Sequence, residues 1–90
     1  MSATLFVLHT VAEYDTWRKA YDGADSLRAK YGCSGETVMR VPGDPNDVAA
    51  THEFPTVAQA EAFANDPAVK DAMEKAGLTS PPRIEIFENA

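Results

Sequence analysis

The 90-residue sequence has one cysteine and lacks any apolar run long enough to span a bilayer. A lone Cys33 excludes an internal disulfide and fits a reducing compartment. The apolar run at residues 3–8 is far shorter than a membrane-spanning helix and has no basic segment before it. These features predict a soluble, cytoplasmic protein that is not exported.

Basic residues are also scarce and form no cluster. Eight lysines and arginines face 14 acidic residues, which gives a formal net charge of -6. A negative protein repels polyanions at long range, so neither nucleic acid nor a membrane is expected as a partner. By itself, the excess of acidic residues is most simply explained as a means of keeping the protein soluble.

Motifs for metals and cofactors are missing as well. The only histidines are His9 and His52, and the chain has no Cys-x-x-Cys or His-x-x-x-His pair. It also lacks a glycine-rich phosphate loop and a dinucleotide-binding fingerprint. We therefore expect no metal and no cofactor, and we interpret Cys33 as a structural or incidental thiol.

What is present is a regular succession of strand and helix patterns over one domain, residues 1–90. Asp15 is the expected cap of a first helix that ends at Gly32, and Thr56 with Gln59 matches a capping box. Asp66 and Pro67 start a further helix. The expected strands are residues 3–11, 36–41, 47–54 and 83–87, and the expected helices are residues 15–31, 57–65 and 67–76. A five-residue loop, PGDPN, is expected to join the middle two strands as a hairpin.

The first helix pattern has a broad apolar stripe with one charged residue in it. At 100° per residue the stripe is about 140° wide. Its members are Tyr14, Trp17, Ala20, Tyr21, Ala24, Leu27 and Tyr31. Arg28 falls inside this stripe, where a guanidinium must reach water, a carboxylate or a ligand anion. Snorkelling from the last helical turn is the simpler explanation, and a ligand contact is the alternative.

The order β-α-β-β-α-α-β predicts an α+β, ferredoxin-like fold built on a split β-α-β unit. Such a fold has a four-stranded antiparallel sheet in spatial order 4-1-3-2 with its helices on one face. Residues 3–11 are apolar on both faces of the strand. The open sheet face therefore needs a cover, and a second copy of the chain, packed sheet against sheet as a homodimer, is the simplest one.

Three motifs resemble one known superfamily. They are His-x-Val-x-Glu-Tyr-Asp-x-Trp at residues 9–17, Asp-Pro-Asn at residues 44–46 and Met-x-x-Ala-Gly at residues 73–77. They resemble small uncharacterised bacterial proteins of the dimeric α+β-barrel superfamily, related to antibiotic-biosynthesis monooxygenases and stress-responsive barrel proteins. The resemblance implies a dimeric barrel. In the monooxygenases it implies oxygenation without a cofactor, although their Asn/Trp/His constellation is not matched here.

The 4-1-3-2 order brings polar residues from distant parts of the chain to one sheet edge. The expected set is His9, Tyr14, Asp15, Trp17, Arg40, Asp47 and Arg83. His9 is the candidate general base or acid, with Asp15 or Asp47 to orient it. The alternative is a strand-end histidine bonded to backbone. His52 is expected to be a packed or dimer-facing residue.

A flat, largely apolar aromatic or polyketide-like molecule is the expected ligand. The candidate binding residues are Tyr14, Trp17, Tyr21, Arg28, Arg40 and Arg83. An aromatic stripe at helical spacing is also what an ordinary core provides. Two functions follow: a cofactor-independent monooxygenase or cyclase-like enzyme, or a non-catalytic metabolite-binding or stress-response module.

Overall fold

The computed structural model describes all 90 residues and contains one four-stranded antiparallel sheet. Its strands are β1 (Ala3–Thr10), β2 (Gly35–Val41), β3 (Asp44–Phe54) and β4 (Arg83–Glu88). They lie in the order β2-β3-β1-β4. This is the predicted 4-1-3-2 arrangement, so the ferredoxin-like α+β fold is confirmed.

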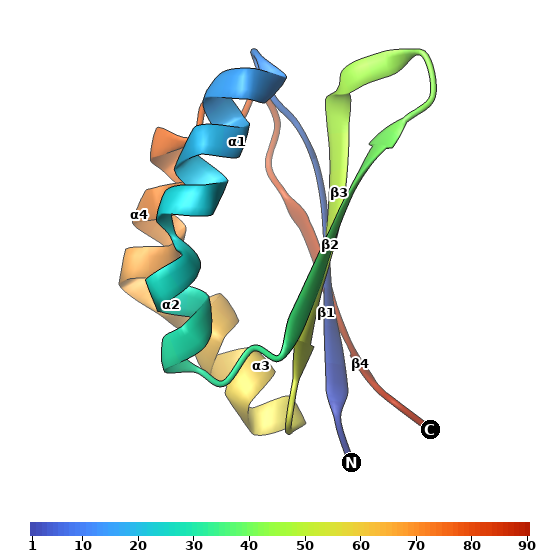
Figure 1. Cartoon of the computed structure of the whole chain (residues 1–90), viewed down its shortest axis with the longest axis vertical. Coiled ribbons are helices and arrows are strands. Elements are labelled where there is room, and N and C mark those ends of the chain that lie inside the picture. Colours follow the sequence, from blue (N-terminus) through green and yellow to red (C-terminus); the bar gives the residue numbers. More distant parts are fainter.

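Four short helices cover one face of this sheet and leave the other open (Figure 1). They are α1 (Tyr14–Gly23), α2 (Asp25–Lys30), α3 (Val57–Asn65) and α4 (Pro67–Lys75). None of these helices has the length and apolar character needed to cross a membrane.

Strand alternation decides which side chains face the helices. Along β1 every second residue is buried, from Ala3 to His9, and the residues between them are half-buried. The buried residues of β3 are Val48, Ala50, His52 and Phe54. Leu5 pairs with His52 and His9 pairs with Val48, so both histidines lie on the helix-covered face. The prediction that β1 is buried on both faces holds for the helix-covered face only, because no helix covers its other face.

The core consists of two clusters between sheet and helices. The larger one includes Leu5, Phe54 and Phe63, and the smaller one includes Trp17 and Val48. The cavity described below adjoins residues of both clusters. Both clusters thus contribute residues to the cavity wall.

The first helix differs from its prediction at both ends. It begins at Tyr14, and its N-cap residue Glu13 makes no side-chain capping bond. Asp15, the predicted cap, is an exposed residue of the first turn. The side chain of Asn46 accepts a hydrogen bond from the Tyr14 amide (3.0 Å) instead. The cap therefore comes from the β2–β3 hairpin, which a local reading of the sequence could not reveal.

The predicted single helix to Tyr31 is in fact two helices. The helical bonding pattern breaks at Ala24, directly after Gly23, and resumes with α2. Glycine weakens a helix interior by about 1 kcal/mol relative to alanine, which favours a break there.

The β2–β3 hairpin turns more tightly than predicted. Only residues 42 and 43 separate the two strands, and Gly43 supplies the positive φ of 84° that the turn requires. The register shifts after Arg40, so that the residues before Val48 form an irregular segment at the start of β3. The predicted loop residues 44–46 therefore belong to the strand.

The predicted helix starts at Thr56 and Asp66 are confirmed. The Thr56 hydroxyl accepts from the Gln59 amide (3.1 Å), and the Asp66 carboxylate accepts from the Ala68 amide (2.7 Å). The Gln59 side chain binds the Tyr31 carbonyl (3.1 Å) rather than closing the capping box. It thereby ties α3 to the end of α2.

Candidate functional site

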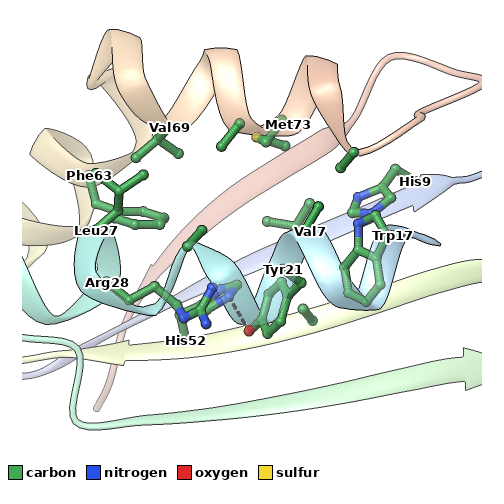
Figure 2. A pocket seen from close by; sticks show the side chains of 15 residues that line it. Val7, His9, Trp17, Tyr21, Leu27, Arg28, His52, Phe63, Val69 and Met73 are labelled. Carbon is green, nitrogen blue, oxygen red and sulfur yellow. Dashed lines mark hydrogen bonds between the residues drawn. The ribbon is translucent and has the colours of Figure 1, made fainter. Parts of the chain in front are cut away.

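A cavity of about 80 Å³ lies between the sheet and the helices. Figure 2 shows its side chains, with His9 and Trp17 at one end and His52 with Arg28 at the other. Fifteen residues line it: Val7, His9, Trp17, Ala20, Tyr21, Ala24, Leu27, Arg28, Ala50, His52, Phe63, Val69, Ala72, Met73 and Ala76. Twelve of them are hydrophobic, so the space is an apolar chamber with a few polar groups.

Small side chains create this space. Ala50 lies on the sheet floor, paired with Val7, in the row between the two histidines. Above it the helices contribute Ala20, Ala24 and Ala72. Because an alanine side chain ends at Cβ, facing alanines leave space that larger side chains would fill. The cavity thus arises because small side chains on several elements leave space unfilled.

His9 is 5% exposed and lines the cavity, and neither of its ring nitrogens has a protein hydrogen-bond partner. Its ring centroid lies 5.5 Å from that of Trp17. Burial lowers the pKa of His9, while the charge of Asp47 raises it to a lesser degree. His9 is therefore a neutral imidazole at neutral pH, free to accept or donate one hydrogen bond to a ligand.

The predicted carboxylate orienter of His9 is not in contact with it. Asp15 is exposed, and Asp47 pairs with Thr10, which places it on the open side of the sheet. Asp47 acts on His9 only through its charge. The structure thus leaves His9 without a fixed tautomer.

His52 is 4% exposed and lines the same cavity, with its Nε2 at 2.8 Å from the Tyr21 hydroxyl. Its Nδ1 is buried without a hydrogen-bond partner. Burial is the main cause that lowers the pKa of His52, and the nearby charge of Arg28 lowers it further. His52 is consequently a second neutral imidazole, and it has a partner on one side only.

Arg28 lies 4% exposed beside this pair, and the structure explains its charge. Its Nε is 2.6 Å from a Glu36 carboxylate oxygen, and its guanidinium carbon sits 4.0 Å from the centre of the Tyr21 ring. The Arg28–Glu36 pair is held by charge and proximity, since the Nε–H makes no well-directed hydrogen bond. Asp25 adds a second, longer contact at 3.6 Å.

The remaining predicted binding residues divide between the two faces of the sheet. Tyr14 contacts Trp17 at 5.8 Å between ring centroids, and the Arg40 guanidinium lies 4.3 Å from the Tyr14 ring centre. Neither of the two lines the cavity. Arg83 pairs with Leu8 on the opposite face and contacts Glu85 at 2.9 Å. The expected convergence thus holds for His9, Trp17, Tyr14 and Arg40, although only the first two line the cavity, and it fails for Arg83, Asp47 and Asp15.

Two functional candidates were missed from the sequence as site residues: His52 and Glu36. Their signal was available in the strand alternation, because His52 has the same parity as Phe54 and Val48. Glu36 pairs with His52 across β2 and β3, so it faces the same side. The face of His52 follows from this alternation alone, whereas the place of Glu36 beside it depends on the strand register, which only the folded sheet supplies. No group of three or more His, Cys, Asp or Glu side chains is placed to hold a metal ion.

No protein-family model and no curated protein sequence matches this chain. Solved structures do match. The cofactor-independent oxygenase SnoaB from Streptomyces nogalater aligns with a TM-score of 0.81 and 13% identity, over 99% of this chain and 93% of that one. An antibiotic biosynthesis monooxygenase aligns with a TM-score of 0.75 and 11% identity, over 98% of each chain.

A third neighbour is NE2512, a protein of unknown function from Nitrosomonas europaea. It aligns with a TM-score of 0.76 and 22% identity, over 98% of this chain and 88% of that one. At these identities the likeness establishes the fold. This chain therefore has the ferredoxin-like α+β fold that antibiotic biosynthesis monooxygenases share, as the motifs at residues 9–17, 44–46 and 73–77 predicted.

Proposed function

We propose that this chain binds a small, flat, largely apolar phenol in the cavity and oxygenates it without a cofactor. The observation that carries this proposal is His9, a buried neutral imidazole on the cavity wall with both nitrogens unpartnered. Leaving such a group unpaired in an apolar site costs about 1–3 kcal/mol, which a ligand hydroxyl would recover. The fold shared with SnoaB, a cofactor-independent oxygenase, supports the reaction class.

The chemistry needs a base and a dry pocket. His9 takes the phenol proton, and the electron-rich ring of the phenolate reacts with dioxygen at carbon. Loss of the remaining ring proton and cleavage of the O–O bond then give a quinone and water. A phenol with a free para position balances as ArH(OH) + O₂ → quinone + H₂O, with both electrons for the second oxygen atom supplied by the substrate. The lowered pKa keeps His9 unprotonated at neutral pH, so that its imidazole is available to accept a proton.

The cavity volume favours a one-ring ligand over a polycyclic one. At about 80 Å³ it is smaller than the roughly 150 Å³ space that holds a benzene in an engineered cavity. Drug-sized ligands occupy about 300–1,000 Å³. Met73 on the helix side is half-buried, and its flexible thioether side chain can move to admit one ring. We therefore narrow the expected ligand to a monocyclic phenol.

The aromatic residues supply the walls in this proposal. Trp17 and Tyr21 stack at 4.9 Å between centroids and line one side of the cavity. Arg28 acts through Tyr21, whose ring it covers. Tyr14 and Arg40 lie beyond Trp17, where they would contact a ligand only as it enters. We assign no ligand contact to Arg83.

A non-catalytic metabolite-binding or stress-response module is the second candidate. It is favoured by the small polar content of the lining, in which only His9, Arg28 and His52 are not hydrophobic. Enzyme sites commonly bring together more titratable groups. The two candidates differ in one outcome: the module returns its ligand unchanged in air, whereas the enzyme consumes oxygen.

We further propose that the chain works as a cytosolic homodimer joined through the open sheet face. The exposed apolar side chains there include Phe87, Met39 and Val41, at 52%, 42% and 42% exposure, with Phe6 between them on the centre of the sheet. Large apolar side chains exposed in this way favour burial against a second copy, even though Thr4, Glu53 and the Arg83–Glu85 pair share the face. Sedimentation is expected to show about twice the 9.7 kDa chain mass, and a stable monomer would contradict the dimer.

A thermal-shift series of 2-methylphenol, 1-naphthol and 1-anthrol tests the binding step. A ligand at 100 times its Kd adds about 2.7 kcal/mol to the unfolding free energy. We expect the one-ring phenol to stabilise the protein most at equal concentration. Stabilisation that grows with ring number would contradict the one-ring proposal, and no stabilisation by any of the three would contradict the pocket.

A further inference from the structure

A line of polar groups leads from the cavity wall to the surface of the sheet. His52 lines the cavity, the Tyr21 hydroxyl lies 2.8 Å from His52 Nε2, and a Glu36 carboxylate oxygen lies 3.4 Å beyond the hydroxyl. The Glu36 side chain is 38% exposed, so the line ends in water. Figure 2 shows the Tyr21–His52 contact with Arg28 beside it.

We propose that His52, Tyr21 and Glu36 form a proton relay between the cavity and solvent, with His52 Nδ1 as the end that meets the ligand. This inference rests on the proposed function for its use in turnover. Its hydrogen-bond arrangement can be tested without any turnover.

The direction of the relay follows from counting hydrogens. Tyr21 has a single O–H, and an ionised carboxylate such as Glu36 only accepts. If Tyr21 donates to His52, its oxygen faces Glu36 lone pair to lone pair, and one good hydrogen bond forms. The Nδ1–H then has only a poorly directed contact with the Leu5 carbonyl. If His52 Nε2–H donates to Tyr21 and Tyr21 donates to Glu36, two bonds form. A carboxylate is also the stronger acceptor of the two.

The second arrangement places the proton on Nε2 and a lone pair on Nδ1. That nitrogen is buried and makes no hydrogen bond of normal geometry within the protein, although the Leu5 carbonyl is close enough to affect the ring. A buried acceptor without a donor is costly, so a donor on the side of the ligand away from His9, such as the hydroperoxide O–H of the oxygenated ring, is its natural partner. The Tyr21–Glu36 contact, at 3.4 Å, is longer than the roughly 2.7–2.8 Å that is usual for an O–H···O hydrogen bond. The Glu36 side chain is partly exposed, so it can move toward the Tyr21 hydroxyl and shorten this contact.

Arg28 keeps the outer end of the relay in place. It lies 2.6 Å from Glu36 and packs on the Tyr21 ring at 4.0 Å, so it fixes both residues at once. The groups facing His52 are Tyr21 from α1, Arg28 from α2, Glu36 from β2 and the apolar ring of Phe63 from α3. His9, by contrast, has no comparable link to solvent.

Each transfer breaks one bond to hydrogen and forms one. His9 takes the phenol proton and returns it to the peroxide oxygen; the ring proton at the oxygenated carbon moves to Nδ1, the Nε2 proton to the Tyr21 oxygen, and the Tyr21 proton to Glu36 and then water. His52 is left as the other neutral tautomer. Cleavage of the O–O bond later releases a hydroxide, and the reverse sequence protonates it to water and restores the first tautomer. Dioxygen is the only co-reactant.

The decisive experiment is ¹⁵N NMR of the His52 ring in the full-length protein at about pH 8, where a histidine of ordinary or lowered pKa is neutral. We expect the Nε2–H tautomer in the wild type. Tyr21→Phe removes the acceptor of that proton and is expected to give a mixture of tautomers. Tyr31→Phe, the same chemical change on a tyrosine outside the cavity, serves as the matched control and should leave His52 unchanged.

A wild-type Nδ1–H tautomer would overturn the proposal, because Tyr21 would then donate its hydrogen bond to His52, and the line of hydrogen bonds would not continue to Glu36. An unchanged tautomer in Tyr21→Phe would overturn it too. Should Tyr21→Phe fail to fold, Glu36→Gln replaces it. The glutamine amide can donate a hydrogen bond to Tyr21 and so reverse the direction of the hydrogen bonds. We therefore expect the His52 tautomer to shift toward Nδ1–H.

Turnover of 2-methylphenol provides a second readout. Tyr21→Phe is expected to lower kcat at least about 10-fold with KM unchanged, and to alter the pH profile. A kcat equal to wild type would contradict the relay. If wild type consumes no oxygen with any phenol, the proposed oxygenase fails, while the tautomer still decides whether the hydrogen-bond chain exists.

Discussion

His9 and His52 face the same cavity from neighbouring antiparallel strands, four residue positions apart along the sheet. Leu5 pairs with His52, and His9 lies four residues further along β1. At about 3.3 Å per residue their backbones are roughly 13 Å apart. Between them lies the row of Val7 and Ala50, which forms the cavity floor. Two neutral imidazoles thus stand at opposite ends of one apolar chamber.

This pair makes stability depend on pH. Burial lowers the pKa of both His9 and His52 in the folded state. The unfolded chain therefore binds more protons below about pH 6.5, and the free energy of unfolding falls as the pH drops. Each histidine contributes at most about 1.4 kcal/mol per pH unit.

Urea unfolding at several pH values measures this slope. The slope should decrease in His9→Gln and again in His52→Gln, since each change removes one titrating group. An unfolding free energy that stays constant between about pH 6.5 and 5 would show that the two histidines are not held neutral.

Trp17 offers an optical probe of His9 alone. It is the only tryptophan, is 3% exposed, and lies 5.5 Å from His9 by ring centroids. Protonation of His9 places a cation beside the indole and is expected to change its fluorescence, with a midpoint below pH 6.5. The transition should vanish in His9→Gln and persist in His52→Gln. A midpoint above 6.5 would contradict the burial argument.

Ala50 sets the size of the cavity. Ala50→Val adds two methyl groups to the floor at a site that is 1% exposed and in a strand, where valine is favoured. Partial filling is expected to raise the unfolding free energy by about 1 kcal/mol and to abolish stabilisation by 2-methylphenol. Ala49→Val, on the opposite sheet face, should leave that stabilisation intact. Equal ligand shifts in both variants would place the ligand elsewhere.

The Arg28–Glu36 pair is expected to respond asymmetrically to substitution. Glu36→Gln leaves a buried guanidinium with only the distant Asp25 as a counter-charge, and is expected to cost about 2 kcal/mol. Arg28→Met leaves a carboxylate that is already 38% exposed and can be hydrated, so it should cost less than about 1 kcal/mol. Thermal unfolding of the two variants compares these costs, and the reverse order would mean that Arg28 is not truly desolvated.

The sequence predicted what depends on local chemistry. Thr56, Asp66 and Gly32 mark helix ends through their own side chains or backbone freedom, and all three do so in the structure. The strand order also followed from the succession of elements. The sequence did not predict the break at Ala24, because the apolar stripe continues unbroken through that position. It did not predict the cap from Asn46 either, because Asn46 lies 32 positions away from Tyr14 in the sequence.

The site was harder to predict because the register decides its composition. Arg83 and Asp47 lie at the expected sheet edge but on the wrong face, since a shift of one position along a strand reverses the side. His52 enters the site through the same rule. The cavity has no sequence motif at all, because it arises where alanines from the helices and the sheet coincide.

Oxygen uptake by the metal-free protein with 2-methylphenol distinguishes the oxygenase from the binding module. We expect uptake of one O₂ per quinone formed, with no added cofactor, and a loss of at least about 100-fold in His9→Gln. A phenol that binds but is recovered unchanged in air would contradict the oxygenase and leave a binding module. Uptake that is equal in wild type and His9→Gln would contradict the role of His9.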